Sequence, residues 1–509
     1  MNHALRLYAS PALRQAEHYA QTLNLPHTLM YLAGQSAAQL AATLKRGDTA
    51  PVLVLAGPGN NGGDACYTAG FLARQGIPVE LLLCADPARY GEDAAQAWAF
   101  ARSSEVSILP QGYQLPPSGD RSLIIDGLFG IGLSRSFSDD IRHLIREVNQ
   151  RAAISNTPIL ALDVPSGLSA DTGALTDAEE AVIHASHTLT FLALKPGLFT
   201  AYGKECCGQI TLETLGAGER WFPASDMALN YPGIITGALP ARRENSHKGS
   251  YGHTVIAGGA CGTVGAALLA ARAALFAGAG KVSIDFPDQG LALDTLHPEI
   301  MCHPNTLPDW HADVYVTGPG LGISDQARQI VMQAIRSDKP QVLDADALNL
   351  IAAHPNLLSA LSQRAAPTLI TPHPLEAARL LKTTAGNIQS DRISAARTLA
   401  QQTGTVVILK GAGSIISAPD GRLRINTSGN AGLASGGSGD VLAGLCGALL
   451  AQGMNTFDAA CLAACVHGQA ADDLVAQGHG PTGLTAGELP VAIRRRLNHP
   501  SITELPATV

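Results

Sequence analysis

Residues 430–440 read Asn-Ala-Gly-Leu-Ala-Ser-Gly-Gly-Ser-Gly-Asp, and residues 441–446 follow at once as Val-Leu-Ala-Gly-Leu-Cys. Glycine and serine gathered in front of an apolar run predict a flexible turn that opens into a buried helix. The first turn of a helix presents unpaired backbone N–H groups and the positive end of the helix dipole, and both suit a phosphate group. The stretch therefore predicts a phosphate site at a helix start.

Asp440 stands at that helix start, where a carboxylate can take a proton from a hydroxyl group that attacks phosphorus. A carboxylate is a poor ligand for phosphate, so its presence favours chemistry over mere binding. The alternative is that Asp440 only caps the helix. The density of glycine and the other motifs of the second half favour the catalytic role.

The composition is that of a soluble globular chain with room for two to four domains, because 46% of its 509 residues are hydrophobic and 15% are charged. A net charge of −8 and the lack of a long basic stripe argue against nucleic acid as a main partner.

The nine cysteines are scattered without zinc-site spacing, which predicts reduced thiols and a cytoplasmic protein. Residues 1–6 lack the apolar core of a signal peptide. The most apolar windows are interrupted by glycine and glutamine, so no membrane span is expected.

Short apolar segments alternate with helical stretches in both halves, the pattern of parallel sheets covered on both faces. A linker is expected at about residues 216–240, which hold several glycines and prolines without clear periodicity. The fold class is therefore α/β with two domains, and ligands are expected at the carboxyl ends of the strands. The predicted strands cover residues 52–56, 79–83, 123–126, 159–163 and 188–191 in the first half, and 253–259, 282–284, 314–316, 342–343, 368–370 and 406–409 in the second.

The first candidate site follows the first predicted strand, where residues 57–64 read Gly-Pro-Gly-Asn-Asn-Gly-Gly-Asp before a helix expected over residues 65–75. Gly57, Gly59 and Gly62 satisfy the spacing of a dinucleotide-binding turn, which alone is a weak signal. The oxygens of two asparagines and an aspartate suit a monovalent cation or a sugar hydroxyl better than a pyrophosphate.

Two later strand ends in the first half carry matching carboxylates, in Asp126-Gly127 and in Asp163-Val164-Pro165-Ser166-Gly167. The loop over residues 131–136 can hold a phosphate through backbone N–H groups and an arginine. A turn-forming or capping role is the alternative for each aspartate. Lys195 follows another strand and can stabilise charge, or it is a solvated surface lysine.

These motifs resemble the NAD(P)H-hydrate epimerase family over roughly residues 10–215, which implies a Rossmann-like parallel-sheet domain. The resemblance implies a potassium ion held by Asn61, Asp126 and Ser166. Inversion of the hydroxylated carbon of the nicotinamide ring can open the carbon–nitrogen bond or lose and regain the hydroxyl, and either route needs a proton transfer. Asp163 is the best candidate base, and Lys195 can stabilise charge. Ala65 stands where the family usually has a further glycine. The residues implied to bind the hydrated nucleotide are Asn60, Asn61, Gly62, Gly63, Asp64, Gly130, Ile131, Gly132, Leu133, Ser134, Arg135, Ser136 and Asp163.

Several strand-end motifs of the second half point to a nucleotide site. Residues 410–414, Lys-Gly-Ala-Gly-Ser, follow a strand and let backbone and a lysine approach phosphates, although the chain has no Walker loop. His373 lies between two prolines, which favours an imidazole presented to a ligand. Gly318 to Gly322 form another strand-end glycine loop. Asp344 and Asp346 suit either magnesium or a helix cap.

These motifs, with His247-Lys248-Gly249, resemble the NAD(P)H-hydrate dehydratase family of the ribokinase-like fold over roughly residues 240–495. The resemblance implies substrate contacts from Ala266, Gly320, His373 and Asp440. It implies nucleotide contacts from Lys410, Gly411, Ala412, Gly413, Ser414 and Gly439.

The two resemblances imply an epimerase domain over residues 1–220 and an ADP-dependent dehydratase domain over residues 240–509, with magnesium expected in the second. The epimerase would interconvert the R and S hydrates of NADH and NADPH. The dehydratase would consume the S hydrate and release AMP and phosphate. Glycine- and alanine-rich halves of this kind also suggest a homo-oligomer.

Three other functions stay open on the residues alone. A ribokinase-like kinase of a small alcohol would share the Asp440 chemistry, but it would not need the first half. An NAD-dependent dehydrogenase would share the glycine spacing, but no paired catalytic histidine or Tyr-x-x-x-Lys motif supports it. A first half that only binds a nucleotide is the non-enzymatic alternative.

Overall fold

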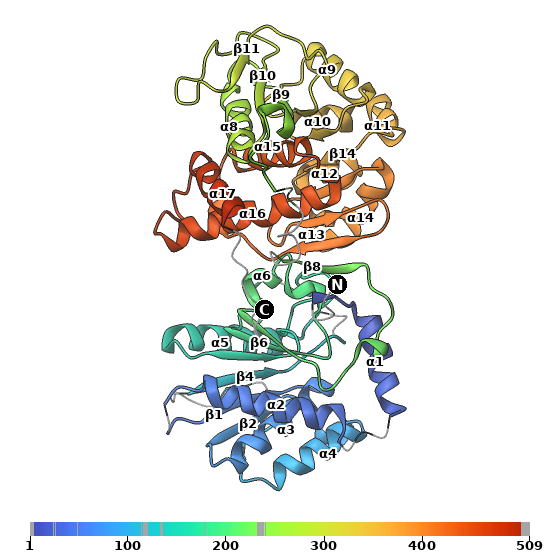
Figure 1. Ribbon diagram of the computed structural model, residues 1–509. Coiled ribbons are helices and arrows are strands. Elements are labelled where there is room, and N and C mark those ends of the chain that lie inside the picture. Colours follow the sequence, from blue (N-terminus) through green and yellow to red (C-terminus); the bar gives the residue numbers. More distant parts are fainter. Residues whose placement is uncertain are drawn as a thin grey trace. The chain divides into compact units, whose positions relative to one another are not determined.

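The computed structural model describes residues 5–23, 25, 27–47, 49–112, 114–115, 121–132, 136–177, 179–231, 239 and 241–499. The chain divides between Ser225 and Asp226 into two compact units, each with its own sheet (Figure 1). Over the part of the chain that the structure describes, no helix is both long and apolar enough to cross a membrane.

The first unit is built on a parallel sheet of seven strands in the order β3-β2-β1-β4-β5-β6-β7. The central strands are continuous apolar runs because both faces of the sheet are covered. The strands are β1 (Val52–Ala56), β2 (Val79–Leu83), β3 (Ser107–Ile108), β4 (Leu123–Gly127), β5 (Ile159–Leu162), β6 (His187–Phe191) and β7 (Gln209–Glu213).

Side chains of β1 alternate between two helical layers. Val52 and Val54 pack in the core with α2 (Leu29–Leu44) and α3 (Asn60–Arg74), whereas Leu53 packs in the core with α5 (Asp139–Ser155) on the opposite face. Figure 1 shows these helices on the two sides of the strands. Two more helices complete the first layer, α1 (Ser10–Gln21) and α4 (Glu92–Arg102).

The strand order reverses between β1 and β4, and the loops that leave these two strands meet. The backbone N–H of Gly57 donates to the carbonyl of Gly127 at 3.0 Å. A crevice at such a reversal is where open α/β sheets bind ligands. The topology therefore directs attention to the loops after β1 and β4.

The second unit is built on ten strands in the order β11-β10-β9-β12-β13-β14-β15-β16-β17-β8. Pairing is parallel from β11 to β15, antiparallel along the β15-β16-β17 ribbon, and parallel again between β17 and β8. The strands are β8 (Met227–Asn230), β9 (His253–Ala257), β10 (Lys281–Asp285), β11 (Met301–His303), β12 (Val314–Thr317), β13 (Gln341–Leu343), β14 (Thr368–Ile370), β15 (Val406–Leu409), β16 (Ile415–Ser417) and β17 (Leu423–Asn426).

Helices cover both faces of this sheet as well (Figure 1). One layer contains α8 (Val264–Phe276), α15 (Ser438–Ala451), α16 (Thr456–Ala476) and α17 (Leu489–Asn498). The other contains α9 (Asp325–Arg336), α10 (Asp346–Ala353), α11 (Pro355–Ser362), α12 (Pro374–Leu380) and α14 (Arg392–Thr403). The strand order reverses between β9 and β12, and there the backbone N–H of Ala260 donates to the carbonyl of Gly320 at 2.7 Å.

The predicted fold class, two α/β domains with parallel sheets, is confirmed, but three details differ. The helix expected over residues 65–75 begins earlier, at Asn60, with Gly59 as its N-cap. Gly62 therefore lies in the first turn of the helix, where a side chain would collide with the carbonyl of Gly57. The stretch expected as a linker contains β8, which the surrounding glycines and prolines concealed. The second sheet is mixed, because the unpredicted β16 and β17 form an antiparallel ribbon.

Candidate functional sites

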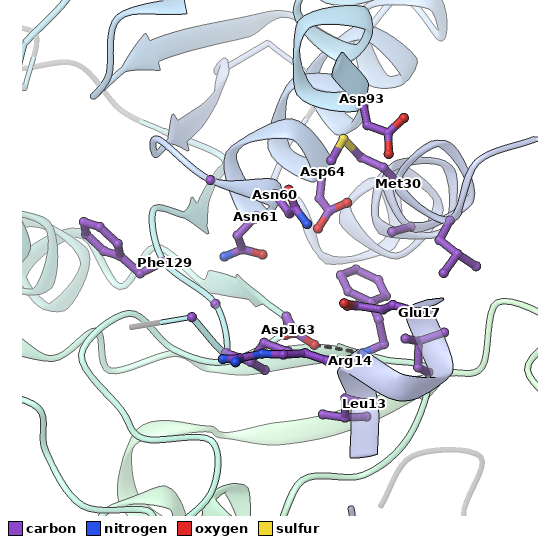
Figure 2. A pocket seen from close by; sticks show the side chains of 18 of the residues that line it. Leu13, Arg14, Glu17, Met30, Asn60, Asn61, Asp64, Asp93, Phe129 and Asp163 are labelled. Carbon is purple, nitrogen blue, oxygen red and sulfur yellow. Dashed lines mark hydrogen bonds between the residues drawn. The ribbon is translucent and has the colours of Figure 1, made fainter. Parts of the chain in front are cut away.

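A cavity of about 1070 Å³ lies at the carboxyl ends of the strands in the first unit (Figure 2). Nine of the residues predicted for this site line it together, namely Asn60, Asn61, Asp64, Gly130, Ile131, Gly132, Ser136, Asp163 and Lys195. Gly62 and Gly63 lie behind the wall, against Gly57 and Met30. Leu133, Ser134 and Arg135 fall outside the described residues.

Asp163 and Lys195 form a buried ion pair at one wall of the cavity. Lys195 Nζ lies 2.7 Å from Asp163 Oδ1 and also donates to Thr190 Oγ1 at 2.8 Å and to the carbonyl of Phe191 at 2.9 Å. Asp163 itself has a positive φ of 66°, a conformation that clusters at functional sites when a residue other than glycine adopts it. Lys195 is therefore not the solvated surface lysine that the sequence left open, because its side chain is only 2% exposed.

Two further carboxylates, Asp64 on α3 and Glu17 on α1, share the cavity with Asp163. Burial raises the pKa of Asp64 well above its usual range, and the charges of Asp163 and Glu17 add to the rise. Burial also raises the pKa of Glu17, with Asp163 as the second cause. Sequence reasoning missed Glu17, which is an ordinary acidic residue of an amphipathic helix.

Asp126 is completely buried at the end of β4. Its Oδ1 accepts from Ser166 Oγ at 2.7 Å, and its Oδ2 accepts from the backbone N–H of Ser166 at 2.8 Å. Burial raises the pKa of Asp126 to about 6, although these hydrogen bonds oppose the rise. A buried carboxylate without a positive partner is costly, so a cation beside it would stabilise the site.

Asn61 supplies the second sign of a cation site. Its side chain is 6% exposed, yet neither its Oδ1 nor its Nδ2 has a hydrogen-bond partner among the described residues. A buried amide oxygen without a donor suits an ion held by oxygens. The residues predicted for potassium, Asn61, Asp126 and Ser166, therefore have the chemistry that the ion needs.

The second candidate site centres on Lys410, which follows β15. Its Nζ lies 2.9 Å from Asp344 Oδ1, after β13, and 3.9 Å from Glu376 Oε2 on α12. Burial raises the pKa of Glu376 to about 7, an effect that the nearby Lys410 charge partly offsets. A β-carbon on Gly439 would lie 3.2 Å from Lys410 Nζ, so the ammonium sits at the start of α15.

Asp440 is the third residue of α15 and does not cap it. The N-cap is Gly437, in the left-handed region with a φ of 90°, and no side chain caps the helix. Burial raises the pKa of Asp440 to about 6, and the charge of Asp344 adds to the rise while Lys410 opposes it. A carboxylate with this pKa is ionised near neutral pH and can accept a proton.

The loop over residues 410–414 rests on Arg392, a residue that sequence reasoning missed. This arginine is 1% exposed and donates to the carbonyls of Leu409 and Lys410 at 3.3 and 3.2 Å. A β-carbon on Gly411 would lie 2.7 Å from its Nη1, and Gly411 has a positive φ of 140°, so any other residue would be strained there. Nothing in the sequence marks Arg392, because arginine is common in helices and its burial depends on the tertiary packing.

The remaining predicted residues border the same edge of the sheet. His373 caps α12 through Nδ1, which accepts from the backbone N–H groups of Leu375 and Glu376, and its side chain is 45% exposed. A β-carbon on Gly320 would lie 3.1 Å from that of Ala266, so the loop after β12 touches the start of α8.

The structure gives Asp344 and Asp346 separate roles. Asp344 pairs with Lys410, and Asp346 Oδ2 accepts from the backbone N–H of Gly322 at 2.8 Å. No side chain caps α10 at its N-cap, Ala345. Across the described residues, no three histidine, cysteine, aspartate or glutamate side chains gather as metal ligands.

Each half of the chain matches a known protein family. The family profile described as YjeF-related protein N-terminus matches residues 26–197, and that described as NAD(P)H-hydrate dehydratase matches residues 254–495. The bifunctional NAD(P)H-hydrate repair enzyme Nnr of Escherichia coli (strain K12) is 39% identical, across 98% of this chain and 94% of that protein. The chain belongs to the family of bifunctional NAD(P)H-hydrate repair enzymes.

Other members of this repair-enzyme family are similarly close. That of Coxiella burnetii is 36% identical across 95% of this chain and 97% of its own length, and that of Leishmania braziliensis is 37% identical across 95% and 92%. A crystal structure of the ADP/ATP-dependent NAD(P)H-hydrate dehydratase from Bacillus subtilis, with ATP and Mg²⁺, is 28% identical with a TM-score of 0.46. It covers 53% of this chain and 98% of that chain.

Proposed function

We propose that this chain repairs hydrated NADH and NADPH in two steps, one in each unit. The first unit interconverts the R and S epimers of the hydrate. The second dehydrates the S epimer with ADP as the phosphoryl donor and releases AMP and phosphate. The observation that carries the proposal is the half-buried Asp440 carboxylate, which stands beside Lys410 at a helix start.

In the second unit, Asp440 takes the proton of the ring hydroxyl as that oxygen attacks phosphorus. Lys410 and the backbone N–H groups at the start of α15 stabilise the negative charge on the transferring phosphoryl group. The phosphorylated hydroxyl is then a good leaving group, and the lone pair of the ring nitrogen expels it as phosphate. Loss of a proton from the adjacent ring carbon to solvent restores the ring double bond and completes the dehydration. Asp344 holds Lys410 in place through their ion pair.

In the first unit, Asp163 is the proposed base. Its Oδ1 is occupied by Lys195 and by the backbone N–H of Phe191, whereas Oδ2 points toward Gly130 at the cavity. Lys195 is a positioning residue, because its ammonium pairs with Asp163 and donates to Thr190 Oγ1 and to the carbonyl of Phe191.

Two cations complete the proposal. Asn61, Asp126 and Ser166 would hold potassium, which would neutralise the buried Asp126 and fix the loop after β4. Magnesium would enter the second site with the phosphates of the nucleotide, since such ions use few carboxylates and several waters. A homo-oligomer and a cytoplasmic location stay predictions.

The direct test is to mix the protein with hydrated NADH that contains both epimers and to follow the absorbance of reduced nicotinamide with ADP, with ATP and with neither. We expect full recovery that depends on the nucleotide. Recovery that stalls or slows sharply once the S epimer is consumed would contradict the proposed epimerase activity. No recovery with either nucleotide would favour a kinase of a small alcohol.

Replacing Asn61 with leucine is expected to lower the affinity of the first unit for potassium by about 10- to 100-fold. The variant keeps a side chain of similar size but loses the amide oxygen. The measurement is the thermal midpoint of the first unit and its epimerase rate across a potassium titration at constant ionic strength. Choline chloride serves as the control salt. An unchanged potassium response in the variant would contradict the assignment.

A further inference from the structure

Asp64 is a carboxylate of the first cavity that performs no visible structural task. It lies in α3, where its backbone carbonyl accepts from Thr68 Oγ1 at 2.7 Å. Its carboxylate makes no hydrogen bond or ion pair with any residue that the structure describes. Figure 2 shows this carboxylate pointing from α3 into the space that Glu17 and Asp163 also border.

A capping role does not explain Asp64. Aspartates near a helix start usually accept hydrogen bonds from free backbone N–H groups. The N-cap of α3 is Gly59, and no side chain caps this helix. An unpartnered, half-buried carboxylate beside two other acids costs stability unless it carries a proton or has a function.

Asp64 and Asp163 occupy different walls of the cavity and different electrostatic environments. Asp163 is held as an ion pair by Lys195 at 2.7 Å, whereas Asp64 has no positive partner among the described residues. Burial and the neighbouring acids raise the pKa of Asp64, which favours its protonated form. Two carboxyl groups with opposite protonation states can work as an acid and a base.

We propose that Asp64 is the acid of epimerisation, which protonates the departing ring hydroxyl while Asp163 accepts a proton from a water that enters from the other side of the ring. This inference rests on the proposed epimerase function. It requires that the ring hydroxyl leaves and a hydroxyl returns, and it is incompatible with opening of the ring.

The step balances without an oxidant or reductant. The carbon–oxygen bond breaks as the proton of Asp64 moves to the hydroxyl oxygen, and a water molecule leaves. The ring nitrogen lone pair supplies the electrons, so the ring becomes a cation. A second water forms the new bond on the opposite face and gives its proton to Asp163. Exchange with solvent then returns both carboxyl groups to their starting states.

The principal test is Asp64→Asn, which keeps the size of the side chain but supplies no acidic proton. Starting from the purified R epimer without nucleotide, we expect kcat for epimerisation to fall about 10²–10⁴-fold while KM changes little. A residue that only shapes the cavity would change KM or stability instead. The outcome that overturns the proposal is a kcat close to that of the wild-type protein.

A second measurement follows the oxygen atom. Wild-type epimerisation in ¹⁸O-labelled water is expected to give S epimer that carries one ¹⁸O, after correction for exchange without protein. Product that keeps its original oxygen at early times would overturn the proposal, because ring opening breaks the carbon–nitrogen bond and leaves this oxygen on its carbon.

The pH dependence of kcat in the wild-type protein is a third test of whether Asp64 acts as an acid. An acid that must be protonated gives a rate that falls as pH rises through its pKa, and this limb should be absent in Asp64→Asn. The titratable and charged groups that line the cavity with Asp64 are Arg14, Glu17, His27, Asp93, Asp163 and Lys195.

Glu92→Gln is the matched control, because it makes the same chemical change at an exposed position at the start of α4. It should leave epimerisation unchanged. Dehydration of the S epimer by Asp64→Asn should also be retained, which shows that the second unit is folded. An unchanged thermal midpoint of the first unit shows that the unit carrying the substitution is folded as well. A wild-type protein without epimerase activity would defeat the proposed function, whereas an active Asp64→Asn would defeat only this inference.

Discussion

Replacing Asp440 with asparagine is expected to lower kcat for dehydration of the S hydrate by about 10²–10⁴-fold, because a positioned general base contributes a factor of this size. Asparagine keeps the shape of the side chain but cannot accept the hydroxyl proton. Binding of ADP should persist, since Lys410 and the start of α15 are unchanged. The measurement is the initial rate of NADH recovery from purified S hydrate at saturating ADP.

The pH profile supplies a second measure of the same role. Burial raises the pKa of Asp440 to about 6, so the active carboxylate form is lost as pH falls through that value. Wild-type kcat should therefore rise with pH up to about 6 and level off above it. Asp325→Asn, at an exposed position of α9, is the control and should keep both rate and profile. An unchanged rate in Asp440→Asn would leave the carboxylate without a catalytic role.

Replacing Asp163 with asparagine is expected to reduce epimerisation by a similar factor, about 10²–10⁴-fold, while dehydration of S hydrate continues. Asparagine is the informative substitution, because it tolerates the positive φ of 66° at this position better than alanine does. Its amide oxygen can still accept from Lys195, so the buried ammonium keeps a partner.

The assay for Asp163→Asn uses a mixture of epimers with ADP. Recovery of NADH should proceed quickly through the S fraction and then continue only at the spontaneous epimerisation rate. Asp139→Asn, which removes a carboxylate that is 96% exposed, should reach full recovery. Complete and fast recovery by Asp163→Asn would exclude this residue as the base.

Much of the fold could be predicted because buried parallel strands are short continuous apolar runs. The bounds predicted for β1, β2, β14 and β15 agree with the structure. The loops of both candidate sites were predictable for the same reason, since the carboxyl ends of parallel strands share one edge. Strands without a continuous apolar run, such as the two-residue β3 and the alternating Leu-Arg-Ile-Asn of β17, were not predicted.

The partners of the site residues could not be predicted, because they depend on contacts between distant parts of the chain. Lys410 and Asp344 are 66 residues apart, and no local pattern couples them. Glu17 reaches the first cavity from a helix that looks like any amphipathic surface helix. The unpartnered amide of Asn61 is visible only once its neighbours are in place.

The strand β8 determines where the dehydratase half can be separated for expression. It is the first strand of the second unit in the sequence but the last in its sheet, where it pairs with β17, and Asn230 Nδ2 donates to Asn426 Oδ1 at 3.0 Å. A shortened protein that starts at residue 240 would lose this strand and leave the edge of β17 bare. Bare edges recruit other chains and promote aggregation. A start at Asp226 keeps the edge covered.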